Sequence, residues 1–398
     1  MKKLLDLFIT FAKMGAVTFG GGYAMLPILQ REIVENKKWG TEEELADYYA
    51  IGQCTPGVIA VNVATFIGRK VAGNLGGVVA TIGVVFPSLV IITLLAGVIE
   101  YYSSLEWVSH AFAGIRVCVC VLIFNAVLKL IKKAVIDFKT LAIYLLVLVC
   151  YFVSDFNISP VIFVIAAGLA GILLKTSRNE EVGSRNNSLF LISNFSLSFS
   201  NFSFLISNFS LLLKLFWEFF NTGLFAVGGG MATLPFLYDI ADRTMWFSRQ
   251  DLANMIAVSE STPGPIGINM ATYAGYLTAG IPGAVIATLG LITPSIIVIL
   301  LIAAFLNAFH DNKFVNGAFY GLRPASCAMI TAAGFVVAHV TFINNNIKAL
   351  SYLDRIEWPA LILAAILIIF TNFIKPTKKF HPVFWIFVAA VVGIVFKF

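Results

Sequence analysis

The chain of 398 residues is 59% hydrophobic and only 12% charged, with a mean hydropathy of +0.90. This composition excludes a water-soluble domain, because too few polar residues remain to face water. The net charge of +6 does not indicate nucleic-acid binding, since the Lys and Arg residues lie between apolar segments and form no single basic face. The sequence therefore predicts an integral membrane protein.

Apolar stretches of about 20 residues recur from end to end, and each is long enough to cross the hydrocarbon core as a helix. Helices are expected because open sheet edges cannot be satisfied in lipid. We therefore predict an all-α membrane protein made of two homologous helical bundles of about six apolar segments each. Those of the first bundle lie near residues 4–29, 43–70, 75–99, 108–131, 140–154 and 157–175, and their counterparts run from about 211 to the end.

An internal repeat defines the two bundles. The segment 20–27, with three glycines and a proline, returns as 228–235, and nearly half of the positions aligned over 45–88 are identical in the second copy. Further pairs keep the register: Thr55-Pro56-Gly57 with Thr262-Pro263-Gly264, Asn62 with Asn269, Pro87-Ser88 with Pro294-Ser295, and Arg116 with Arg323.

The repeat predicts three parts: a first transporter repeat at 1–175, a low-complexity linker at 176–212 and a second transporter repeat at 213–398. The distribution of Lys and Arg in the first half predicts that its N-terminus is cytoplasmic. In the second half the Lys and Arg bias favours the opposite orientation. This pattern favours inverted repeats with broken or re-entrant helices, as in many secondary transporters. Inversion requires an odd number of crossings before the second half, so either the linker crosses or one apolar segment is re-entrant.

Helix breaks inside apolar segments are the first candidates for an anion site. Three consecutive glycines weaken a helix and let the backbone approach a ligand closely, although close packing of helices is the alternative. The residues concerned are Gly20, Gly21 and Gly22 in the first half and Gly228, Gly229 and Gly230 in the second.

The two Thr-Pro-Gly motifs fit an N-cap followed by proline at the first helical position. We expect Thr55-Pro56-Gly57 and Thr262-Pro263-Gly264 each to start a helix in mid-membrane with free N–H groups, which suits an anion; a proline kink is the alternative. Asn62 and Asn269 follow closely, and their amides can donate hydrogen bonds either to an anion or between helices.

Three charged residues lie within or beside apolar segments. Arg116 and Arg323 are expected to begin the fourth segment of each half, where a guanidinium either binds an oxyanion or extends to the membrane interface. Glu260 lies two residues before Thr262, and its counterpart in the first half is the neutral Gln53. We predict proton coupling through Glu260, with a local salt bridge or a water-facing carboxylate as the alternative.

The sequence shows no pattern typical of an enzyme, a cofactor site or a metal site. It contains no His-Glu-x-x-His, no Gly-x-Ser-x-Gly and no phosphate loop, and its five cysteines give no disulfide framework. We therefore expect neither catalysis nor a cofactor. A non-transporting receptor or scaffold is a remote alternative. Such a protein would have no need of the paired helix breaks that this sequence predicts.

Several of these motifs together resemble the chromate transporter family in its two-domain, fused form: the Gly-Gly-Gly-Tyr stretch with Pro27, the Trp39 loop, the segment from Gln53 to Asn62, and their counterparts with Thr262-Pro263-Gly264-Pro265. The resemblance covers both halves but not the linker. By the family pattern, the triple glycines and the Pro-Gly-Pro segment carry over as functional. Val58 stands where the second half has Pro265, so the halves are expected to differ in role.

The resemblance implies a multi-pass transporter of the bacterial inner membrane that exports chromate. Sulfate or another small anion is the alternative substrate. The implied partners are a small oxyanion and the lipid bilayer, without nucleic acid, and a homo-oligomer is left open.

Overall fold

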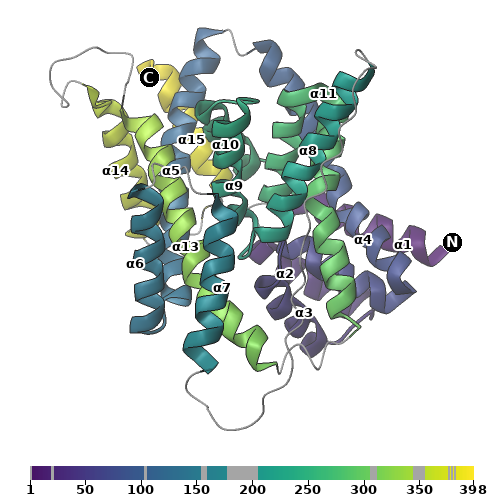
Figure 1. The fold of residues 1–398 in the computed structure, drawn as a ribbon. Helices are drawn as coiled ribbons and strands as arrows, with labels where there is room; N and C mark the ends of the chain where they lie inside the picture. The colour runs from purple at the N-terminus through teal and green to yellow at the C-terminus, as the bar shows by residue number, and fades with distance from the viewer. Residues whose placement is uncertain are drawn as a thin grey trace.

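The fold was analysed in a computed structural model (Figure 1). It describes residues 2–398 except 19–21, 103–104, 154–158, 177–204, 305–311, 344–354, 375–376, 378–379 and 381, and all its regular elements are helical. The first half holds α1 (Lys2–Val17), α2 (Gly22–Leu29), the π-helical η1 (Gln30–Asn36), α3 (Glu42–Cys54), α4 (Ile59–Tyr102), α5 (Glu106–Ala134), α6 (Phe138–Val153) and α7 (Pro160–Thr176). The second holds α8 (Leu205–Phe225), the 3-10 helix η2 (Gly230–Thr233), α9 (Leu234–Thr244), α10 (Arg249–Ser261), α11 (Ile266–Ile302), α13 (Lys313–Phe342), α14 (Trp358–Asn372) and α15 (Pro382–Phe396).

The two halves repeat the same elements. Helix α3 corresponds to α10, α5 to α13, and α4 to α11. Both α4 and α11 are broken at equivalent Ala-Gly pairs with non-helical backbone, Ala72-Gly73 and Ala279-Gly280. Each therefore consists of a short arm and a long arm, which in α4 are 59–71 and 74–102. The predicted all-α fold with broken helices is confirmed.

Two pairs of helices in the first half turn back on themselves. Lys37, just after η1, forms a salt bridge with Asp6 near the start of α1, so the chain returns to the end from which it entered. Lys70, at the end of the short arm of α4, pairs likewise with Glu44 at the start of α3. These pairs form two helical hairpins whose tips point into the protein.

Helices α5 and α13, which are equivalent in the repeat, run antiparallel. The start of α5 shares one cavity with the end of α13, whereas the end of α5 shares another with the middle of α13. In Figure 1, α5 and α13 lie beside each other. This arrangement confirms the predicted inverted repeats.

The halves are also interlocked. Helix α7 packs along α13, with Gly171 against the backbone of Gly317 and Gly321. Helix α15 of the second half packs along α5 of the first in the equivalent way, at Gly114 and Gly393. The small residues allow close backbone contact between helices, as membrane bundles require.

Within the described residues, four helices are long and apolar enough to cross a bilayer, namely α4, α5, α11 and α13, and four shorter apolar helices accompany them. The chain is a multi-pass membrane protein. The part boundaries at 175 and 212 stay a prediction. Most of the predicted linker lies outside the described residues, and α8 begins inside it at Leu205.

The tips of the hairpins cross between the halves. The Gly57 N–H donates to the Ala226 carbonyl at 2.9 Å, and the Gly264 N–H donates to the Thr18 carbonyl at 2.7 Å. Gly57 (φ +93°) is pressed against Ser295, so that a Cβ at this position would overlap the Ser295 Oγ. Gly264 is pressed against Ser88 of the first half in the same way.

We predict that Gly57→Ala destabilises the protein by about 3 kcal/mol or more, because it adds a clash with Ser295 to the strain of a positive φ. Thermal unfolding of the detergent-purified protein would measure the loss. Gly73→Ala is the matched control, since Gly73 also has a positive φ (+65°) but has open space around it. Equal losses in the two variants would show that the contact with Ser295 is unimportant.

Candidate functional site

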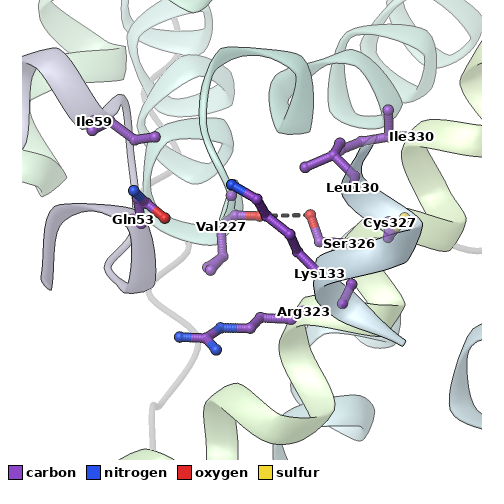
Figure 2. Close-up of a pocket in the computed structure, with 11 residues that line it drawn as sticks. Gln53, Ile59, Leu130, Lys133, Val227, Arg323, Ser326, Cys327 and Ile330 are labelled. Atoms are coloured by element: carbon purple, nitrogen blue, oxygen red, sulfur yellow. Dashed lines mark hydrogen bonds between the residues drawn. The ribbon is translucent and has the colours of Figure 1, made fainter. Parts of the chain in front are cut away.

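A cavity of about 180 Å³ lies where the two halves meet. Gln53 of α3 and Lys133 at the end of α5 line it from the first half, and Arg323 and Ser326 of α13 line it from the second. Figure 2 shows that Lys133 extends across the cavity toward Gln53, with the Arg323 guanidinium below them. Two cationic side chains and an amide are therefore gathered in one small space.

The wall of this cavity contains the helix break of the second half. The Ser326 hydroxyl donates to the Val227 carbonyl at 2.5 Å, a bond drawn in Figure 2. Gly228, with φ +115°, follows directly and lines the cavity. The hydroxyl therefore satisfies a carbonyl that the broken helix leaves without a helical partner. Such irregular backbone is tolerated at membrane depth where it borders a cavity.

The structure describes all three glycines of the second triplet but only one glycine of the first. Gly229 is the residue before η2, and Gly230 is its first residue. Gly20 and Gly21 lie outside the described residues, and Gly22 begins α2. Of the four glycines that the structure describes, Gly228 lines the cavity.

The structure corrects the expected position of both arginines. Arg323 does not begin α13 but lies ten residues after Lys313, and Arg116 lies ten residues after Glu106 in α5. At 1.5 Å per residue both are roughly 15 Å from the helix start. The helix continues on both sides of each arginine because the apolar pattern extends upstream of it.

The structure also corrects the two Thr-Pro-Gly motifs. Thr55 and Thr262 are the C-caps of α3 and α10, and the next helices begin four residues later, at Ile59 and Ile266. Each threonine hydroxyl donates back to a carbonyl in the last turn of its own helix, and proline then prevents the helix from continuing. The Gly57 and Gly264 N–H groups are not free, since both donate to the other half.

Asn62 and Asn269 hold these turns together. The Asn62 amide donates to the Thr55 hydroxyl and to the carbonyls of Gly52 and Pro56, at 3.0 to 3.2 Å. Asn269 makes the three equivalent bonds in the second half. Both side chains are fully buried. Their amide donors are therefore occupied within the protein. This agrees with the expected alternative in which these amides bond between helices and not to an anion.

Glu260 is buried, with 6% of its surface exposed, in the last turn of α10. Among the described residues, no side chain forms a hydrogen bond or an ion pair with its carboxylate. Its counterpart Gln53 lines the Arg323 cavity. The second half thus has an ionisable group where the first half presents a neutral amide to the cavity.

Sequence reasoning missed Lys133 and Ser326 as site residues. Lys133 belongs to a run of lysines near the end of α5, which resembles the charges that set topology. One signal could have distinguished it: the repeat aligns Lys133 with the apolar Val340, so this lysine is specific to one half.

Inverted helical repeats that meet at broken helices around a polar cavity define a membrane transporter architecture. The profile of the chromate transporter family matches residues 5–172 and 213–394, which together are most of the chain. The chain belongs to the chromate transporter family.

Three relatives illustrate the similarity. A chromate transport protein of Cupriavidus metallidurans is 26% identical over 342 residues, covering 86% of this chain and 84% of its own length. A probable chromate transport protein of Synechococcus elongatus is 25% identical over 404 residues, with 100% and 95% covered. An uncharacterized transporter of Bacillus subtilis is 28% identical over 182 residues, which are 46% of this chain but 94% of its own. No solved structure matches the chain.

We predict that Asn62→Asp destabilises the fold by about 3 kcal/mol or more, because a carboxylate oxygen would face three acceptors in a buried turn. Thermal unfolding in detergent would again measure the loss. Asn36→Asp, at the exposed last residue of η1, should change the midpoint little. A normal midpoint for Asn62→Asp would contradict the holding role of this amide.

Proposed function

We propose that this protein exports chromate across a bacterial inner membrane and that the cavity of Arg323, Lys133 and Gln53 is where the anion loads. The observation that carries the proposal is the convergence of two cationic side chains from different halves on a cavity beside a helix break. The chemistry agrees with the family, to which relatives named as chromate transport proteins are also similar.

The residue types suit a tetrahedral dianion. The planar fork of Arg323 can donate two parallel hydrogen bonds to an oxyanion, while Lys133 supplies a compact charge. Gln53 can donate from its amide without adding charge. The cavity, at about 180 Å³, has room for a small oxyanion together with several water molecules.

The position of the cavity suggests the direction of loading. It lies at the end of α5, where Lys129, Lys132 and Lys139 are also found. An excess of Lys and Arg marks the cytoplasmic side of a membrane protein. The Arg323 cavity should therefore open to the cytoplasm.

The membrane potential favours export. A dianion leaving an inside-negative cell gains about 2.3 kcal/mol per charge per 100 mV, or roughly 4.6 kcal/mol in all. Secondary transport outward can therefore proceed without nucleotide hydrolysis. Sulfate has the same charge and shape, so it is the alternative substrate, and a competition assay separates the two.

We predict that Arg323→Ala and Lys133→Ala each lower chromate uptake into inside-out membrane vesicles about 10- to 100-fold, since each removes a charge-assisted hydrogen bond to the anion. Radiolabelled chromate, with and without excess sulfate, would be followed at matched protein levels. Lys132→Ala is the control, because Lys132 is an exposed neighbour that does not line the cavity.

Wild-type uptake no greater than that of empty vesicles would reject chromate transport and would return attention to a receptor or scaffold. Uptake abolished by sulfate at low concentration would instead favour sulfate as the substrate. Equal losses in Lys132→Ala and Lys133→Ala would argue against the cavity as the loading site.

We further propose that Glu260 couples the transport to protons. Burying a carboxylate in a membrane protein costs free energy, so such a residue indicates a functional site. In wild-type vesicles, an imposed pH gradient should then change the initial rate of chromate uptake. Glu260→Gln should remove that response while keeping uptake driven by the membrane potential. Glu43→Gln, at an exposed position in α3, is the control. An unchanged response to the gradient in Glu260→Gln would refute the coupling role.

A further inference from the structure

A second cavity, of about 400 Å³, lies at the other end of the α5 and α13 pair. Arg116 of α5 lines it together with Val340 and Thr341 of α13 and Gln250 of α10. Arg116 is half-buried, and its Nη1 donates to the Asn254 Oδ1 at 3.1 Å. The guanidinium is thus held on one side by an uncharged partner, which leaves its charge uncompensated by that contact.

Part of the lining of the two cavities is equivalent under the internal repeat. Arg116 corresponds to Arg323, and Val340 corresponds to Lys133. In each cavity an arginine in the first half of one helix faces the last turns of its antiparallel partner. The inverted repeat therefore places an arginine opposite the end of the partner helix twice, once at each end of the helix pair, although the rest of each lining differs.

The cavities differ in charge. Where the Arg323 cavity has Lys133, the Arg116 cavity has the apolar Val340. Lys397 and Glu357, which carry opposite charges, also line the Arg116 cavity and offset each other. The Arg116 cavity is larger in volume than the Arg323 cavity, and its lining is less cationic.

We propose that the Arg116 cavity is a second site for a small oxyanion, weaker than the Arg323 cavity and open toward the opposite side of the membrane. This inference rests on the proposed function. An anion that loads at a strongly cationic cavity and leaves through a weakly cationic one meets a site from which it can dissociate readily. The weaker site would serve release.

The test is equilibrium binding of radiolabelled chromate to the purified, full-length protein in detergent. We expect the wild type to show a strong and a weak class of sites. Arg323→Ala should remove the strong class and Arg116→Ala the weak one. Asn254→Ala, which removes the hydrogen bond to Arg116 but keeps its charge, should retain the weak class.

A variant that should gain affinity provides an independent test of the second site. Val340→Lys restores the missing cation beside an intact Arg116, and it should tighten the weak class about 10-fold. The same variant should slow chromate export, because release becomes harder. An unchanged weak class in Val340→Lys would overturn the proposal.

The outcomes separate this inference from the proposed function. A single class of sites that Arg323→Ala abolishes and Arg116→Ala leaves intact would overturn the second site alone. Loss of the weak class in Asn254→Ala as well as in Arg116→Ala would show that Arg116 acts only as a structural residue. No binding at all to the wild type would reject the chromate assignment and the second site together.

Discussion

Two crossed hydrogen bonds join the halves of this protein at its centre, from the Gly57 N–H to the Ala226 carbonyl and from the Gly264 N–H to the Thr18 carbonyl. Helices that end inside a membrane leave polar backbone groups that lipid cannot satisfy. Here an N–H group at a hairpin tip of each half donates to a carbonyl beside the helix break of the other half. The broken helices that form the candidate site can therefore exist only where both halves are present.

The same dependence explains the exchange of helices at the periphery. Helix α7 lies on α13 and α15 lies on α5, so each half covers the long helix of the other. An isolated half would lose the partners of its hairpin tip and those of its long helix at once.

The repeated motifs made much of this arrangement predictable. The all-α fold, the broken helices and the inversion followed from hydropathy, from the recurrence of the motifs and from the Lys and Arg bias. The turns at Thr55 and Thr262 could not be placed correctly, because Thr-Pro fits the start of a helix and also the end of one. Asn62 resolves this ambiguity only in three dimensions, where its amide reaches back to the Gly52 carbonyl. Lys133 was missed because a lysine at a helix end is typical of topology, and its approach to Arg323 depends on the antiparallel pairing of two distant helices.

The candidate loading site lies on the seam between the halves. Gln53 and Lys133 come from the first half, whereas Arg323 and Gly228 come from the second. Any rocking of one half against the other would therefore change the distance between Lys133 and Arg323, the two cations of the proposed loading site. Moving the two cations slightly apart weakens the attraction felt by a dianion, because the Coulomb energy falls as the distance grows. It falls further when water enters, because water raises the local dielectric constant. In inverted-repeat transporters such relative motion of the repeats exposes the site to alternate sides. Placing one cation on each half makes anion affinity depend on the same motion that would change access.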